Sequence, residues 1–136
     1  PVYSVKYGGK TMLDESPLGL STNIGDFTSG MKFIKSNTSK VEKEYTMNRS
    51  KFSQISYKAN EACFALSNAK GHPMEICFRV SNNDIAFQYR IAKRGETGSI
   101  RIMGEATGFD FPSHTTTFLT PQSDPMIGWK RTKPSY

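Results

Sequence analysis

Residues 74–91 constrain the fold more than any other part of the chain. Two stretches of strict alternation are separated by four polar residues, Ser81 to Asp84. The apolar positions are Met74, Ile76, Phe78 and Val80 in the first stretch, and Ile85, Phe87, Tyr89 and Ile91 in the second. A period of two residues is typical of strands that bury one face, and Ser, Asn and Asp tolerate turn dihedrals. The segment therefore predicts a β-hairpin within an antiparallel sheet.

The rest of the sequence extends this β pattern. Residues 2–7 and 11–13 predict a second hairpin with a turn at Gly8-Gly9. Further strands are predicted at 51–56, 61–67, 99–103, 106–111 and 115–119. The polar region 21–50 predicts weak strands at most, near Met31–Ile34 and Glu44–Met47. Since no segment has an apolar helical repeat, the fold class predicted is all-β, an antiparallel β-sandwich formed by one domain, residues 1–136.

The charge and hydropathy of the sequence limit the classes of molecule that the chain is expected to bind. The net charge of +6 permits an acidic partner. However, Lys40, Glu42, Lys43 and Glu44 mix both signs, which favours a solvated face over a nucleic-acid patch. No run approaches the roughly 20 apolar residues of a membrane span. We therefore expect neither nucleic acid nor membrane as a partner.

The two cysteines, Cys63 and Cys77, leave two alternatives open. Antiparallel pairing of their strands would let them face each other and form a disulfide. Two cysteines are not a disulfide framework, however, and half-buried free thiols are the favoured interpretation. No CxxC or HxxxH spacing is present, so no metal site or cofactor is expected in this chain.

Three blocks resemble the N-terminal domain of the family 97 glycoside hydrolases, in the family's order and over nearly the whole chain. They are 3–10 with 16–20, 76–89, and 104–112. The second block is similar to the family's hairpin Phe-Arg-Val/Leu-x-Asn-Asp-Gly-x-Ala/Gly-Phe-Arg-Tyr. This chain departs from it at Asp84, where the family usually has Gly, and at Gln88, where it has Arg. Aspartate tolerates left-handed dihedrals, so the turn can survive.

The resemblance implies a larger parent protein that cleaves α-glucosidic or α-galactosidic bonds. In the family, a β-supersandwich similar to galactose mutarotase precedes a catalytic (β/α)₈ barrel. This chain would be a truncated part of that sandwich without the barrel, which would be its partner together with the oligosaccharide substrate. One branch of the family binds calcium through a glutamate that would follow shortly after Tyr136. The resemblance also implies a periplasmic or otherwise exported protein.

No catalytic residue is predicted in the chain itself. Glycoside hydrolysis needs two carboxylates roughly 5–9.5 Å apart, and no motif pairs two of the candidates. These candidates are Asp84, Glu105, Asp110 and Asp124. Each favours a structural role, and Asp84 is expected to cap backbone amides of its turn. His72 and His114 are expected at the surface.

The substrate-binding candidates are Trp129, Lys130 and Arg131. An aromatic face can stack on a sugar ring, and cationic neighbours donate to hydroxyls. Alternatively, Trp129 simply packs beneath a loop.

Two functional hypotheses remain. In the first, the chain is a non-catalytic sandwich that supports and closes the barrel active site of a glycoside hydrolase. In the second, it is a freestanding carbohydrate-binding β-sandwich. A truncated sandwich would leave a sheet edge and a core face uncovered, so the fragment is expected to form a homodimer.

Overall fold

The structure is a computed structural model, and it describes residues 1–48, 51, 53–93 and 98–118. Within these residues the regular structure is entirely β, and the predicted all-β antiparallel class is confirmed. The strands are β1 Val2–Tyr7, β2 Lys10–Pro17, β3 Leu20–Thr22, β4 Gly25–Asp26, β5 Lys32–Thr46, β6 Gln54–Ser67, β7 Pro73–Val80, β8 Ile85–Arg90 and β9 Ile102–Glu105. In the same residues, no helix long and apolar enough to cross a bilayer is found.

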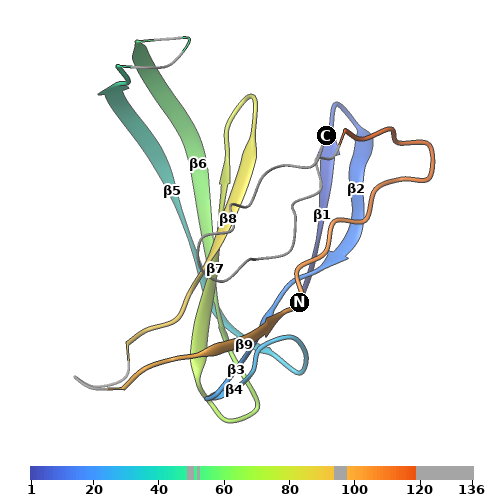
Figure 1. Ribbon diagram of the computed structural model, residues 1–136, viewed down its shortest axis with the longest axis vertical. Coiled ribbons are helices and arrows are strands. Elements are labelled where there is room, and N and C mark those ends of the chain that lie inside the picture. Colours follow the sequence, from blue (N-terminus) through green and yellow to red (C-terminus); the bar gives the residue numbers. More distant parts are fainter. Residues whose placement is uncertain (49–50, 52, 94–97, 119–136) are drawn as a thin grey trace, which may run out of the picture.

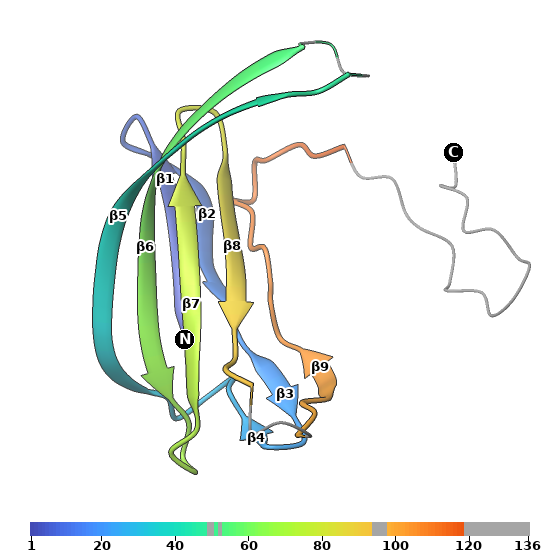
Figure 2. The same cartoon turned by 90° about the vertical axis from the view of Figure 1, so that its left-hand side faces the viewer.

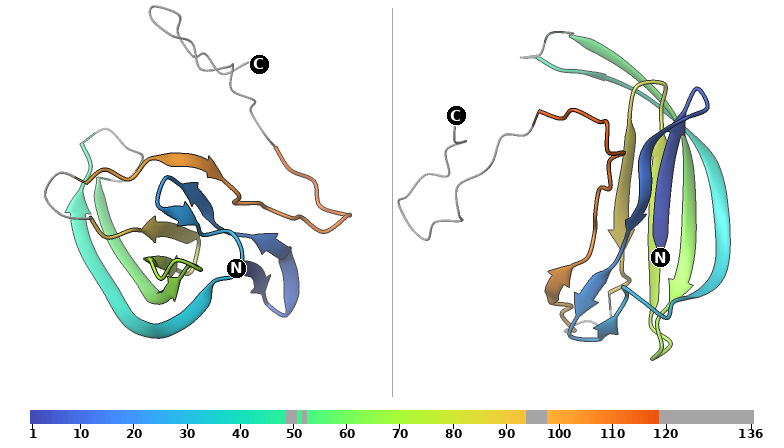
Figure 3. Two further views of the ribbon diagram at one scale, coloured as in Figure 1. Left: turned by 90° about the horizontal axis from the view of Figure 1, so that it is seen from below. Right: turned by 90° about the vertical axis from the view of Figure 1, so that its right-hand side faces the viewer.

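The strands form two facing layers (Figure 1). One layer is the sheet β5-β6-β7-β8, and the other contains the β1-β2 hairpin and the small sheet β4-β3-β9. Residues 106–110 join the parts of the second layer because they run beside β2: the Gly108 amide donates to the Pro17 carbonyl at 3.0 Å and the Asp14 amide donates to the Asp110 carbonyl at 2.8 Å. Figure 2 shows β1 and β2 behind the large sheet, and the right panel of Figure 3 shows them in front of it.

The core lies at the end of the molecule where β3 and β4 meet β7. Its buried side chains come from both layers, and they are Leu18, Leu20, Phe27, Met74 and Ile76. Met74 and Ile76 are the inward positions that the alternation predicted. Tyr3, Phe78, Phe87 and Tyr89 continue this face toward the opposite end but are only partly buried. The two layers are therefore well packed at one end and open at the other.

Both predicted hairpins are present. Gly8 and Gly9 have φ values of 55° and 79°, which is the left-handed conformation that a tight two-residue turn requires. In the β7–β8 turn, the Ser81 hydroxyl accepts hydrogen bonds from the Asn83 amide at 3.2 Å and the Asp84 amide at 3.0 Å. The expectation that the Asp84 carboxylate caps this turn is therefore wrong, since serine does so instead.

The prediction for residues 21–50 is wrong in its main part. Instead of weak strands near 31–34 and 44–47, β5 runs unbroken from Lys32 to Thr46. Nearly all its side chains are exposed, so it lacks the apolar alternation that marks a half-buried strand. Its order comes from the backbone ladder with β6, which extends from Lys32↔Ser67 to Thr46↔Gln54. Likewise β6 is one strand where two were predicted.

Two predicted strands near the end of the described chain differ in detail. Residues 106–110 are hydrogen-bonded along β2 without being a regular strand, and β9 begins at Ile102 rather than Ser99. Residues 115–118 lie outside any strand, and Leu119 lies outside the described residues.

The favoured prediction of free thiols is also wrong. Cys63 and Cys77 are direct partners in the β6–β7 register and form a disulfide, with Cα atoms 4.0 Å apart. The bond lies on the face of the large sheet that points away from β1 and β2, because the side chains that alternate with these cysteines, Phe64 and Phe78, line the space between the layers.

Candidate functional site, an aromatic groove

The open end of the sandwich gathers aromatic rings from distant parts of the sequence. Alternation on β7 and β8 turns Phe78 and Phe87 toward the second layer, where Tyr3 of β1 meets them. The ring centroids of Tyr3 lie 5.9 Å from Phe78 and 5.8 Å from Phe87. Phe109 adds a ring 6.5 Å from both Tyr3 and Phe87. These separations are typical of aromatic pairs that attract each other.

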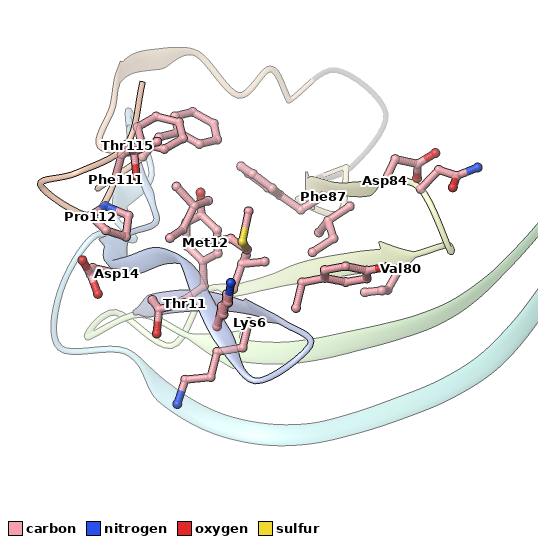
Figure 4. Close-up of a pocket in the computed structure, with 18 of the residues that line it drawn as sticks. Lys6, Thr11, Met12, Asp14, Val80, Asp84, Phe87, Phe111, Pro112 and Thr115 are labelled. Atoms are coloured by element: carbon pink, nitrogen blue, oxygen red, sulfur yellow. The ribbon is translucent and has the colours of Figure 1, made fainter. Parts of the chain in front are cut away.

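The rings of Tyr3, Phe87 and Phe109 line one side of a groove of about 1230 Å³. The groove lies between the β1–β2 hairpin, the β7–β8 turn and residues 109–115. Figure 4 shows Met12, Val80, Phe87 and Phe111 around this space, each from a different segment. A smaller groove of about 580 Å³ opens between β1 and β5–β6, over Phe33, Phe64 and Phe78. Phe109 remains 58% exposed, so much aromatic surface is accessible.

A chain of hydrogen bonds fixes the hydroxyl of Tyr89, at the buried end of the aromatic cluster. The buried Gly19 amide donates to Tyr89 Oη at 2.9 Å, and Tyr89 Oη lies 2.7 Å from Thr107 Oγ1. The Thr107 hydroxyl donates to Glu105 Oε1 at 2.7 Å. Because the single Thr107 proton is used on Glu105, Tyr89 must donate to Thr107. Glu105 therefore has the hydrogen-bonded position that a structural role requires.

A second phenol, that of Tyr3, joins two segments of the second layer at the edge of the groove. Tyr3 donates its hydroxyl proton to the Gly108 carbonyl at 3.1 Å. Burial raises the pKa of the Tyr3 hydroxyl above its ordinary value. Tyr3 is consequently a neutral donor at physiological pH, and it ties β1 to residues 106–110.

The other candidate residues are dispersed. Asp84 and His114 line the groove rim, and both are exposed. The Asp110 amide donates to Ser16 Oγ at 2.8 Å, while its carboxylate is exposed. His72 is half-buried rather than at the surface, and its amide donates to Asn68 Oδ1 at 2.9 Å. Asp124, Trp129, Lys130 and Arg131 lie outside the described residues.

The described residues contain no group of three or more His, Cys, Asp or Glu side chains placed to hold a metal ion. The glutamate that the resemblance implies for calcium would follow Tyr136. A calcium requirement therefore stays a prediction about the parent protein and not about the residues described.

The opposite face of the large sheet carries a charged network beside the disulfide. Arg79 Nε donates to Glu61 Oε2 at 2.6 Å, and the Arg90 guanidinium lies 3.6 Å from the same oxygen. The hydrogen bond from Arg79 holds the pKa of the Glu61 carboxyl below its usual range, against the opposing effect of desolvation, and the Arg79, Arg90 and Lys43 charges add to it. With the Gln88 amide oxygen turned toward Arg90, Arg90 Nε donates to it at 2.8 Å. Gln88 thus supplies a neutral acceptor for the Arg90 guanidinium.

The groove offers aromatic surface rather than reactive groups. Its rings could stack on a sugar ring or pack against further protein, and the phenols near it are already hydrogen-bonded. The fold and the groove together define an antiparallel β-domain with an uncovered inner face.

Comparison with known proteins identifies the family. The family described as glycosyl-hydrolase 97 N-terminal matches residues 1–136. The chain belongs to this family.

Its relatives are much longer proteins. A crystal structure of a β-arabinopyranosidase is 52% identical over 99% of this chain and 22% of that one, with a TM-score of 0.87. A probable retaining α-galactosidase of Streptomyces bingchenggensis (strain BCW-1) is 28% identical over 85% of this chain and 18% of its own length. Family 97 enzyme structures from Pseudoalteromonas sp. strain K8, in complex with panose or acarbose, share the fold at 22% identity, with a TM-score of 0.74 over 98% of this chain and 21% of theirs. The chain thus spans about a fifth of the length of these proteins.

Proposed function

We propose that this chain is the non-catalytic N-terminal β-sandwich of a family 97 glycoside hydrolase, in which it supports and closes the active site of a catalytic barrel. The observation that carries the proposal is the aromatic inner face, which stays open in a chain that spans about a fifth of the length of its relatives. The missing cover would come from the rest of the parent chain.

The free energy that burial of the exposed groove side chains would release supports a covering segment in the parent protein. Fully burying a large apolar side chain is worth about 1.5–3 kcal/mol, yet Tyr7 is 73% and Phe109 58% exposed. Residues 109–115 form one wall of the groove. Further polypeptide of the parent protein would complete the sandwich by covering this wall and the rings beside it.

The compartment proposed is periplasmic or otherwise exported. The Cys63–Cys77 disulfide supports this, because disulfides persist in oxidising compartments and are rare in the cytosol. For the parent, calcium bound through a glutamate beyond Tyr136 remains part of the proposal.

The substrate proposed is a glycoside with the ring configuration of galactose. Two relatives carry named activities, a β-arabinopyranosidase and a probable retaining α-galactosidase. An α-D-galactopyranoside and a β-L-arabinopyranoside have the same configuration around the ring and differ only by the hydroxymethyl group at C5. A parent protein that resembles both would recognise this shared ring and would discriminate at C5.

Kinetics with aryl glycosides test the proposal. The full-length parent and the isolated residues 1–136 would be assayed on an aryl α-galactoside, a β-L-arabinopyranoside and an α-glucoside. We expect the parent to hydrolyse the first or second fastest and the isolated chain to hydrolyse none. Enzyme-like turnover by residues 1–136 would contradict the non-catalytic assignment. Preference of the parent for the α-glucoside would contradict the substrate class.

A freestanding carbohydrate-binding module is the second candidate, and the exposed rings of the groove favour it. Aromatic faces stack on the C–H surfaces of sugars. Titration of residues 1–136 with galacto- and arabino-oligosaccharides separates the two. Tight, saturable binding by the isolated chain supports a module, whereas a surface meant for further protein binds sugars weakly or not at all.

A further inference from the structure

The β5–β6 hairpin continues beyond the rest of the large sheet. The pairing of β6 with β7 ends at Asn60↔Val80, whereas β5 and β6 stay paired as far as Thr46↔Gln54. The extension, here called the arm, consists of residues 41–46 of β5 and 54–59 of β6. Figure 2 shows it passing beyond the ends of β7 and β8 as a ribbon of two strands.

The two faces of the arm differ in chemistry. Side chains alternate between faces along each strand, and direct cross-strand partners share a face. One face pairs Val41 with Ala59, Lys43 with Tyr57 and Tyr45 with Ile55. The opposite face is polar and exposed, and it carries Glu42, Glu44, Thr46, Gln54, Ser56 and Lys58. The arm therefore has one face that is apolar apart from Lys43 and one solvated face.

The apolar face lacks a covering layer among the described residues. The element contacts of β5 and β6 are with each other and, for β6, with β7. Tyr45 remains 49% exposed, although Ala59 nearer the sheet is 8% exposed. An isolated two-stranded ribbon is marginally stable in water, and a third layer or strand is normally needed. A long amphipathic arm of this kind therefore indicates an interface.

The arm protrudes from the sandwich, since in Figure 1 it extends at the upper left, on the side away from the β1–β2 hairpin. The length of related proteins indicates what covers it. The β-arabinopyranosidase structure matches 99% of this chain, which includes the arm, and has 78% of its own length outside the match, given the 22% covered. In a parent protein of similar length, polypeptide that follows this chain is thus long enough to reach the arm.

We propose that the apolar face of the arm is an interface with the part of the parent polypeptide that follows Tyr136, an inference that rests on the proposed function. The stripe formed by Val41, Tyr45, Ile55 and Tyr57 is the contact surface, and Glu42, Glu44 and Lys58 keep the opposite face in solvent. The arm thereby contacts the same portion of the enzyme that the sandwich supports.

Thiol labelling of adjacent positions on the two faces tests the interface. Tyr45→Cys and Glu44→Cys would each be made in the full-length parent protein, because both side chains are exposed in this structure and they point to opposite faces. Labelling is followed by mass spectrometry of the peptide that contains the introduced thiol. We expect position 45 to label about tenfold or more slowly than position 44.

Equal labelling rates at positions 44 and 45 would overturn the interface. Protection of position 45 that disappears on dilution would also overturn it, since a second copy would then be the cover. If Tyr45→Cys fails to fold, hydroxyl-radical footprinting of the wild-type parent reads the same side chain, and modification of Tyr45 at the rate of an unfolded tyrosine would contradict the inference.

The wild-type parent protein is assayed for glycoside hydrolysis alongside the labelling experiments. An active parent with equal labelling rejects the arm interface alone. A parent inactive on every glycoside rejects the proposed function, whatever the labelling rates are.

Discussion

At the scale of single residues, the backbone around Gly19 packs too closely to leave room for a Cβ atom. This residue has φ of 146°, and a Cβ atom there would lie 2.6 Å from both the Phe27 carbonyl oxygen and the Thr28 Cα. Both obstacles are backbone atoms and cannot rotate away. Gly19 is also buried and donates to Tyr89, so it joins the layers at the core.

Gly19→Ala is therefore expected to destabilise the protein by about 2 kcal/mol or more. Chemical denaturation followed by far-ultraviolet circular dichroism measures the change in the free energy of unfolding. Gly104→Ala is the matched control, because Gly104 lies in β9 with open space around it. Equal stability of the two variants would refute the packing argument.

Tyr89→Phe isolates the hydrogen-bond chain from the aromatic packing. The ring stays 5.8 Å from Phe87, but the buried Gly19 amide loses its acceptor. An unsatisfied buried donor costs about 1–3 kcal/mol, and we expect a loss of stability of this size. Tyr7→Phe serves as the control, since the Tyr7 side chain is 73% exposed. A loss of stability no greater than that of Tyr7→Phe would show that the hydrogen bonds of Tyr89 contribute no net stability.

Glu61 makes stability depend on pH. Its pKa is lowered in the folded protein, chiefly by the Arg79 hydrogen bond. Its stabilisation is therefore fully present above the unfolded value of about 4.3 and is lost as the pH falls through the lower folded value. We expect Glu61→Gln to lower Tm at pH 7 by a few degrees and to match the wild type near the acid end. Glu42→Gln, on the exposed face of the arm, should leave the pH profile of Tm unchanged.

At the scale of elements, the sequence predicts strands where burial imposes alternation and misses them where it does not. The β7–β8 hairpin was predictable because Met74, Ile76 and Phe87 face the second layer. The long edge strand β5 was not, since residues 35–40 are polar on both faces and gain their order from pairing with β6. The same limit applied to the cysteines: alternation placed them on one face, but the register that makes Cys63 and Cys77 partners is set by the turn between their strands.

Removal of the disulfide should loosen this part of the large sheet. The two cysteines are 14 residues apart, and closing a loop of this size stabilises a fold by about 3 kcal/mol in the chain-entropy account. We expect the Cys63→Ala, Cys77→Ala double variant to unfold at lower denaturant concentration than the oxidised wild type. Reduction should lower the stability of the wild type and leave the double variant unaffected. An equal response of both proteins to the reductant would exclude a stabilising role for the bond.

At the scale of the whole molecule, the sequence indicated a sandwich but could not indicate the groove. Tyr3 and Phe109 lie far apart in the sequence, and only the pairing of residues 106–110 with β2 brings their rings to 6.5 Å. The predicted binding candidates were instead Trp129, Lys130 and Arg131, which lie outside the described residues. Side-chain type marks where aromatic surface exists, whereas the order of strands decides which surfaces face each other.

The uncovered inner face should control the association of the isolated chain. Exposed apolar patches and free sheet edges promote self-pairing, and a two-fold dimer would bury the same groove on both copies. We expect residues 1–136 to sediment as a dimer at high concentration in analytical ultracentrifugation. Phe109→Asp should shift this equilibrium toward the monomer because it places a charge among the groove rings.

Phe118→Asp is the matched control for this equilibrium, since Phe118 is 98% exposed and does not line the groove. Equal weakening by both substitutions would mean that loose apolar contacts, rather than the groove, hold the dimer. A wild-type chain that stays monomeric at high concentration would mean that water covers the inner face at little cost, and the main physical reason for a covering segment in the parent would then fail.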